Sequence, residues 1–234
     1  MSKINACFCY PFVKPKEPSN LVLFCEAHDS IPEAEARDYL SRCRQYAKTY
    51  HVYLTAGPFI IQNRLCLCLL DPDGHPLAIQ KATYLNLLHH AALDPADRIQ
   101  VIKTELGSLS LLPGVDVFHP EVSRAAVLQG AEVLLSVAFL DAYDLNPIRS
   151  MSGCWAAAQA NQVPVLGVSN VDCCVAAPCS LTNNSSGFIL APQTAFPALA
   201  TVYPHKTNRL REEESLPARL NPAFIDRYRA QLSL

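Results

Sequence analysis

The side chains best suited to chemistry in this sequence are three charged residues that end or follow apolar runs. Glu26 ends the run at 21–26, Lys81 follows a second strand-like run, and Glu121 lies shortly after a third. A carboxylate in such a place can exchange a proton, and an ammonium group can stabilise developing negative charge. A single charge at a strand end is usually only solvated, so the flanking residues must decide whether these three form a site.

Cysteine is the other reactive residue type, and ten of them is an unusual number for 234 residues. The sequence contains no C-x-x-C pair and no histidine pair at metal-ligand spacing, so we expect no bound metal. No secretory signal is visible, which argues against disulfides. We therefore expect the cysteines to be small buried hydrophobic residues, most of them in strands. Their number suggests a reducing cell. They occur at positions 7, 9, 25, 43, 66, 68, 154, 173, 174 and 179.

Several common functions find no support in the sequence. It lacks a G-x-G-x-x-G turn, a P-loop, an H-E-x-x-H pair and a G-x-S-x-G elbow, so we expect no nucleotide or other cofactor. A net charge of −2 gives no basic face for nucleic acid. No apolar run approaches the roughly 18 residues of a membrane span, and we expect a soluble, cytoplasmic protein.

The elements that must position the charged residues alternate between strands and helices. This alternation predicts an α/β or layered α+β fold with a single domain over 1–234. A charged, proline-punctuated tail at 203–234 is expected to be solvated or to cross to another subunit. We predict strands at 1–10, 21–26, 52–56 (closed by Gly57), 109–112, 132–137, 165–169 and 186–190, helices at 31–50, 120–129 and 151–161, and a hairpin of 65–70 with 76–80 around the turn 71–74.

Five segments, taken in order, resemble the carbon–nitrogen hydrolases of the nitrilase superfamily. LVLFCE at 21–26 is similar to that family's apolar strand ending in Phe-Pro-Glu, with Cys25 in place of the proline. QKATYL at 80–85 resembles its Arg-Lys-x-His-Leu segment. The resemblance continues through 106–124, 130–138 (GAEVLLSVA) and 156–170, and so covers about three quarters of the chain.

The resemblance implies a four-layer αββα sandwich, commonly paired into homodimers, that acts on a small amide, nitrile or carboxylate. It also implies a Glu-Lys-Cys site, in which a thiolate attacks the amide or nitrile carbon. Glu26 matches the carboxylate base and Lys81 the group that stabilises negative charge on the substrate. Glu121 matches the second, orienting glutamate.

The nucleophile itself does not match, because alignment places Gly114 where the family has cysteine. Glycine has no side chain, so no covalent intermediate can form there. In an unrelated hydrolase, loss of the nucleophile costs about 10⁶-fold in turnover. The tyrosine that follows the nucleophile is Val115 here, and an arginine–glutamate pair further along is Ala158 and Ala160.

Three interpretations remain open. In the first, the protein is non-catalytic and binds a small amide, nitrile or carboxylate, or serves as a regulatory subunit. An active amide hydrolase would need a glutamate-activated water or a relocated thiol, for which Cys25, Cys154, Cys173 and Cys174 are the candidates. A purely structural chain is the third, because the connection before Leu21 is too short for a helix and would leave apolar sheet surface to be covered by oligomerisation. We expect His89 and His90 to be solvated loop residues.

Overall fold

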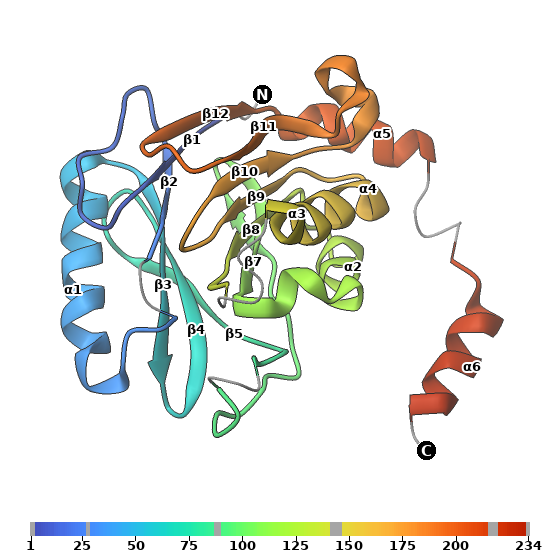
Figure 1. The fold of residues 1–234 in the computed structure, drawn as a ribbon, viewed down its shortest axis with the longest axis horizontal. Coiled ribbons are helices and arrows are strands. Elements are labelled where there is room, and N and C mark those ends of the chain that lie inside the picture. The colour runs from blue at the N-terminus through green and yellow to red at the C-terminus, as the bar shows by residue number, and fades with distance from the viewer. Residues whose placement is uncertain (1–2, 27–28, 87–89, 141–146, 215–219, 233–234) are drawn as a thin grey trace.

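The fold is a sandwich of two sheets with helices on both outer faces, seen in a computed structural model that describes residues 3–26, 29–86, 90–140, 147–214 and 220–232. In Figure 1 helix α1 (Glu33–Tyr50) covers one sheet and helices α2 (Pro120–Leu128) and α4 (Ala156–Asn161) cover the other. The layers therefore run α–β–β–α, as predicted. This arrangement is the single-domain α/β architecture that the strand–helix alternation indicates.

The first sheet has six strands in the order β12-β1-β2-β3-β4-β5. Strands β1, β2 and β3 are parallel, whereas β4, β5 and β12 join antiparallel at the two sides. Their bounds are β1 (Ile4–Cys9), β2 (Leu21–Phe24), β3 (Tyr53–Ile61), β4 (Arg64–Leu70), β5 (Pro76–Lys81) and β12 (Ala198–Val202).

The second sheet repeats this plan in the order β11-β10-β9-β8-β7-β6. Strands β7, β8 and β9 are parallel, and β6, β10 and β11 are antiparallel additions. Parallel strands bring their carboxyl ends to one edge of a sheet, so loops after these strands gather there. The bounds are β6 (Ile102–Thr104), β7 (Gly107–Pro113), β8 (Val133–Val137), β9 (Val165–Val168), β10 (Cys173–Ala176) and β11 (Phe188–Gln193).

Side-chain alternation along the strands divides the core into layers. On β2, Leu21 and Leu23 point into the space between the sheets, whereas Val22 and Phe24 point towards α1. Successive strand residues face opposite sides of a sheet, so a continuous apolar run suits a strand that is buried on both faces. The layer between the second sheet and its helices is equally apolar.

The outer helices are amphipathic on the side that meets the sheet. Helix α1 buries Ala36, Tyr39, Cys43, Tyr46 and Ala47, which recur at the three- and four-residue spacing of one helix face. Helix α4 buries Ala157, Ala158 and Asn161. It is preceded by the short helix α3 (Pro147–Ser150) and by a π-helix, η2 (Met151–Trp155). Short 3₁₀ turns follow β7 (η1, Gly114–Phe118) and β10 (η3, Cys179–Leu181; η4, Asn183–Ser185).

Several element predictions are confirmed and some are wrong. The hairpin of β4 and β5 forms around the turn at 71–74, as expected. Gly57, however, does not close its strand. It takes a φ of +118° at an irregularity in the β3–β4 pairing, and the strand continues to Ile61. Strands β6, β10 and β12 were not predicted, because each is short or carries few β-branched residues.

The short connection after β1 does not leave the sheet bare. Cys7 and Cys9, on the outer face of β1, are 0% and 1% exposed, because the loop that carries Phe12 packs over that face beside α1. The expected exposed apolar surface at this place is therefore wrong. The loop replaces a helix as the cover of this strand.

The ten cysteines are all free thiols, and nine of them are buried. Six of the ten lie in strands β1, β4 and β10, which agrees with their expected role as small hydrophobic residues. Within the described part of the chain, no helix is both long and apolar enough to cross a bilayer.

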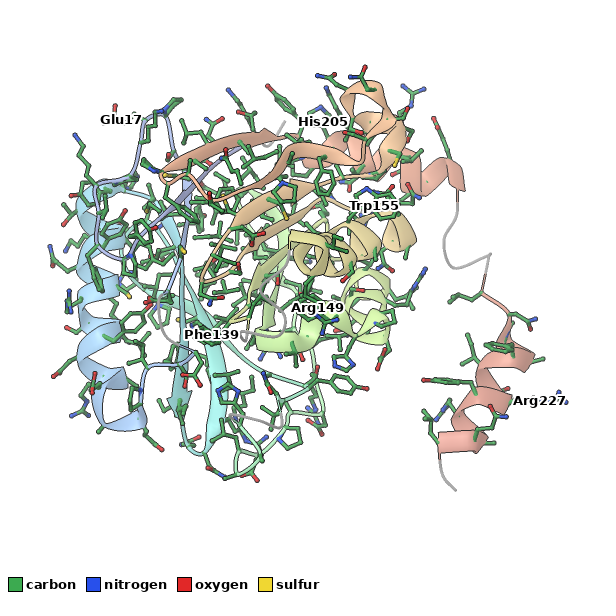
Figure 2. The ribbon with its side chains drawn as sticks, in the orientation of Figure 1. Glu17, Phe139, Arg149, Trp155, His205 and Arg227 are labelled. Carbon is green, nitrogen blue, oxygen red and sulfur yellow. The ribbon has the colours of Figure 1, made fainter. Side chains whose placement is uncertain are left out.

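The tail contains two helices. Helix α5 (Pro204–Glu214) packs on the body, where Thr207 is 3% exposed and Arg211 donates a hydrogen bond to the carbonyl of Ala131. Helix α6 (Pro222–Leu232) lies apart from the sheets and buries none of its residues, as Arg227 in Figure 2 illustrates. The tail is thus solvated only in its last part.

Candidate active site

Gly114 lies directly after β7, at the carboxyl end of a parallel strand. Its φ of +59° falls in the left-handed region that favours glycine, and a Cβ atom built there would lie 3.0 Å from Cδ2 of Leu65. A cavity of about 10 Å³, room for about one water molecule, adjoins it. Phe139, one of its lining residues, follows the carboxyl end of β8 and is labelled in Figure 2. The lining consists of Asp29, Leu65, Asn86, His90, Gly114, Val115 and Phe139.

Asp116 ties the segment after β5 to the segment after β7. Its carboxylate is completely buried and accepts hydrogen bonds from the backbone N–H groups of Thr83 and Tyr84, at 3.1 and 2.7 Å, and from the Thr83 hydroxyl at 2.8 Å. Burial raises the pKa of the Asp116 carboxyl to about 6, although these hydrogen bonds oppose the shift. The two segments whose sequences resemble the hydrolase motifs are therefore in contact.

Glu26 is held by helix α1. It is 8% exposed, and its Oε1 accepts a hydrogen bond of 2.6 Å from the hydroxyl of Tyr39, which in turn accepts one of 3.0 Å from the N–H of Gly57. Burial, together with the nearby Cys43 and Glu26, raises the pKa of Tyr39 well above its ordinary value, so Tyr39 stays protonated as the donor. Cys25 points to the opposite face of the strand, as predicted.

Lys81 is the last residue of β5, opposite Cys66 in the β4–β5 pairing. Cys66 belongs to the core beneath α1, so Lys81 leaves the sheet on that same outer face. No ion pair joins Lys81 to a carboxylate of the described residues. The hollow that it lines is separate from the cavity at Gly114 and is formed with Arg64, Gln80, Ala96, Asp97, Arg98 and Gln100.

Glu121 lies in the first turn of α2, where an acidic residue suits the helix dipole. Its side chain is 47% exposed, accepts a hydrogen bond from the Tyr84 hydroxyl and lies 3.8 Å from Nδ1 of His119. Burial would raise the pKa of Glu121, but the Tyr84 hydrogen bond and His119 outweigh it and lower the pKa. The Tyr84 and His119 rings stack at 3.6 Å, which fixes this cluster beside α2 rather than at Gly114.

His90 and Asp29 are the residues that sequence analysis missed. His90 is 5% exposed and lines the Gly114 cavity, with its Nε2 atom 3.7 Å from Oδ2 of Asp29. The expectation of a solvated His90 is therefore wrong, whereas His89 lies outside the described residues. Only the fold brings Asp29 and His90 together, so no local spacing could have indicated the pair.

Two of the candidate relocated thiols, Cys25 and Cys173, are buried and hard to ionise. Burial, with Glu26 and Asp172 nearby, raises the pKa of Cys25 to about 12, and its thiol donates a hydrogen bond of 2.9 Å to the carbonyl of Ser169. Burial raises the pKa of Cys173 to about 12 in the same way. A thiol with such a pKa is thiolate in only about one part in 10⁵ at neutral pH. Neither is a ready nucleophile.

The sandwich and its loops define the class of fold. The chain is similar to a carbon–nitrogen hydrolase from Helicobacter pylori G27, with a TM-score of 0.77, 15% identity, and coverage of 97% of this chain and 98% of that one. It is also similar to Nit3 of Saccharomyces cerevisiae, a member of the nitrilase superfamily, with a TM-score of 0.70, 15% identity, and coverage of 91% and 94%. The chain thus has the fold of the carbon–nitrogen hydrolases.

A third similar structure is a mutant amidase from Nesterenkonia sp. AN1 in complex with butyramide. It has a TM-score of 0.66 and 20% identity, and the match covers 93% of this chain and 97% of that chain. No protein-family model matches the chain, and no curated protein matches it in sequence. At these identities the likeness defines the fold and leaves the chemistry to be argued from the residues.

Proposed function

We propose that this chain is a non-catalytic protein of nitrilase fold that binds a small amide, nitrile or carboxylate without forming a covalent intermediate. The observation that carries the proposal is Gly114, which stands at the nucleophile position with Leu65 packed where a side chain would emerge. The binding protein acts as a sensor or as a regulatory subunit rather than as a hydrolase.

The surroundings of the three charged residues support this proposal. Glu26 hydrogen-bonds to Tyr39 on the α1 side, Lys81 lines a separate hollow, and Glu121 hydrogen-bonds to Tyr84 beside α2. The family's reaction needs a base, a positive charge and a thiol around one carbon atom. None of these three residues lines the cavity at Gly114.

The cavity lining favours a small ligand with one polar end. Asn86, His90 and Asp29 offer hydrogen-bonding groups to an amide or carboxylate, and Leu65 and Phe139 offer apolar contact to a short alkyl group. The space of about 10 Å³ limits the deeply held part of the ligand to very few atoms.

Acetamide and butyramide are suitable probes, since a mutant of the Nesterenkonia amidase was seen with butyramide. We expect saturable changes in the NMR spectrum of this protein on adding either amide, with no ammonia above the buffer background. Asn86→Ala should weaken binding, and Gln129→Ala, an exposed change beside α2, should not. Ammonia release by the wild-type chain, or equal binding by both variants, would contradict the proposal.

A second candidate function is amide hydrolysis by an activated water. The specific observation behind it is the buried His90, which lies 3.7 Å from Asp29 and lines the same cavity. A histidine oriented by a carboxylate can take a proton from water. Ammonia release that disappears in both His90→Gln and Asp29→Asn would establish this function in place of the first.

We also propose that the chain works in the cytoplasm as a homodimer. Ten free thiols suit a reducing compartment.

The dimer is proposed from helix α6, which carries exposed apolar side chains along one face. An isolated helix of this length is not stable in water, so we assign a second copy of the chain as the partner that covers this face. Light scattering should give a dimer that Phe224→Ser with Leu232→Ser converts to a monomer. The exposed residues are Phe224, Ile225, Tyr228 and Leu232.

A further inference from the structure

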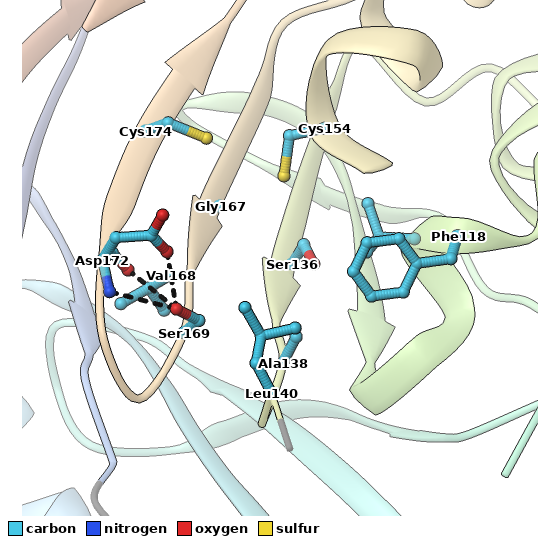
Figure 3. Close-up of a pocket in the computed structure, with 11 residues that line it drawn as sticks. Phe118, Ser136, Ala138, Leu140, Cys154, Gly167, Val168, Ser169, Asp172 and Cys174 are labelled. Atoms are coloured by element: carbon cyan, nitrogen blue, oxygen red, sulfur yellow. Dashed lines mark hydrogen bonds between the residues drawn. The ribbon is translucent and has the colours of Figure 1, made fainter. Parts of the chain in front are cut away.

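Two buried thiols meet over a glycine on the outer side of the second sheet. Cys174 on β10 is the cross-strand partner of Gly167 on β9. A Cβ atom at Gly167 would lie 2.3 Å from the sulfur of Cys154 and 3.4 Å from the sulfur of Cys174. The space that a side chain at 167 would fill is therefore taken by sulfur atoms, and Figure 3 shows the two cysteines on either side of Gly167.

The local structure around Cys154 adds a second observation. Cys154 belongs to the π-helix η2, a wider turn that is uncommon in proteins and occurs frequently at functional sites. A hydrogen bond between the two cysteines raises the pKa of Cys174 well above its ordinary value, so Cys174 keeps its proton next to the sulfur of Cys154. Two sulfurs from different elements therefore lie next to the same point, the Cβ position of Gly167.

A small cavity reaches both sulfurs. Its volume is about 10 Å³, room for about one water-sized molecule. Its lining is mainly apolar and includes both cysteines, and Ser136, Ser169 and Asp172 add polar side chains. The hydroxyl of Ser169 donates a 2.6 Å hydrogen bond to Asp172 (Figure 3). A small polar molecule such as a peroxide that enters this space would contact both sulfurs.

We propose that Cys154 and Cys174 form a dithiol site that a small peroxide oxidises reversibly to a disulfide. Cys154 gives up its thiol proton as its sulfur attacks one peroxide oxygen. The O–O bond breaks, a sulfenic acid forms, and the other oxygen takes that proton and leaves as water. The sulfur of Cys174 then attacks the sulfenic sulfur, the S–S bond forms, and a second water leaves. Two thiols and one hydrogen peroxide give one disulfide and two waters.

The chain contains a close thiol pair that serves as an internal comparison. A hydrogen bond with Cys9, together with Lys16 and Ser19, lowers the pKa of Cys7 to about 7 despite its burial. Both cysteines lie two residues apart on one face of β1. Such neighbours are separated by about 6.6 Å with parallel Cα–Cβ bonds, whereas a disulfide needs Cβ atoms about 3.8 Å apart. The pKa of Cys7 is therefore lowered, but the spacing along the strand prevents a disulfide between Cys7 and Cys9.

The disulfide would join the π-helix to β10 and so restrain the segment that leads into α4. Reduction would release that segment. The consequence is measurable as protection of the amide groups of residues 151–161 from hydrogen exchange, which should rise on oxidation and fall again with dithiothreitol.

The test uses the full-length chain, reduced and then freed of reductant. It is exposed to a small excess of hydrogen peroxide, its free thiols are blocked with N-ethylmaleimide in denaturant, and its peptides are mapped without reduction. We expect a Cys154–Cys174 crosslink as the first disulfide, reversed by dithiothreitol. A different first disulfide, or ten free thiols after treatment, would overturn the proposal.

Variants separate geometry from reactivity. Cys154→Ser and Cys174→Ser should each abolish the crosslink, whereas Cys68→Ser, a buried cysteine in the other sheet, should leave it unchanged. Gly167→Ala should slow crosslinking at least about tenfold, because the new methyl group displaces the sulfur of Cys154. Circular dichroism shows which variants fold, and the wild-type peptide map decides the matter if any does not.

Discussion

Covalent hydrolysis needs a thiol, a base and a carboxylate in one place, but here these groups lie in two separate small cavities, at Gly114 and at Gly167. The cavity at Gly114 has a buried histidine and a carboxylate, but Gly114, which the sequence resemblance places at the nucleophile position, carries no side chain. The cavity at Gly167 has two sulfurs, but Cys154 and burial, with a smaller contribution from Asp172, raise the pKa of Cys174. The side chain of Leu65 lies next to the Cβ position of Gly114, and the sulfur of Cys154 lies next to that of Gly167.

This difference teaches that a layered fold positions loops without fixing what they carry. The same strand ends that gather Asp116, Thr83 and Tyr84 into one hydrogen-bonded cluster leave Glu26 on the α1 side and Glu121 beside α2. Architecture alone therefore does not give activity, which depends on side chains within bonding distance of one point.

The largest expected effect is on the scaffold of the Gly114 cavity. Asp116→Ala removes a fully buried acceptor and leaves the N–H groups of Thr83 and Tyr84 without it. Urea denaturation should show a loss of about 3 kcal/mol in the free energy of unfolding. Asp97→Ala, a change at an exposed carboxylate, should cost less than about 0.5 kcal/mol. Equal losses would mean that Asp116 holds nothing together.

The same carboxylate should give the stability a pH dependence. Its pKa is raised from 3.8 to about 6 by burial, so the folded chain holds a proton that the unfolded chain releases across this interval. The contribution of Asp116 to the free energy of unfolding is therefore greatest below pH 3.8. It falls by up to about 3 kcal/mol as the pH rises through 6. The Asp116→Asn variant should lack this contribution. A constant difference between the two proteins from pH 4 to 7 would contradict the prediction.

The two glycines should differ in their tolerance of a methyl group. Gly167→Ala places Cβ at 2.3 Å from the sulfur of Cys154 and should cost about 2 kcal/mol or more. Gly114→Ala meets only the far end of Leu65 at 3.0 Å, and its left-handed φ adds a cost of about 1 kcal/mol. Thermal melting of the two variants compares the cavities directly. A larger loss at Gly114 would reverse the comparison.

Sequence analysis predicted many single elements because hydrophobic periodicity is a local property, whereas the four layers were implied by the resemblance to the nitrilase superfamily. The apolar run at 21–24, the helix that starts at Glu33 and the hairpin around 71–74 all follow from neighbouring residues. Strand β12 escaped prediction because it pairs with β1, at the other end of the chain. Strand β10 has only four residues, and its pairing with β9 and β11 stabilises it more than its own composition does.

The candidate site was harder to predict for the same reason. Gly114 and Glu26 could be located from flanking motifs, but the direction in which Glu26 points depends on its contact with Tyr39. His90 looked like a loop residue because nothing near it in sequence indicates Asp29 as a neighbour. The pairing of Cys154 with Cys174 depends on the absence of a side chain at Gly167, across two elements.

The smallest expected effect is that of restoring a thiol at the nucleophile position. Gly114→Cys introduces the missing group, but Glu26 remains hydrogen-bonded to Tyr39 and Lys81 remains in its own hollow, so ammonia release from acetamide should stay at background. Fluoroacetamide, whose acetamide moiety adds to the active-site cysteine of a Nesterenkonia amidase mutant, tests whether the new thiol is reachable. Mass spectrometry should find at most slow labelling, and the Gly114→Ser variant gives the blank. The prediction is contradicted if Gly114→Cys turns over acetamide and the additional change Glu26→Gln removes that turnover. The base, the positive charge and the nucleophile would then converge, and one glycine alone would separate this chain from an active hydrolase.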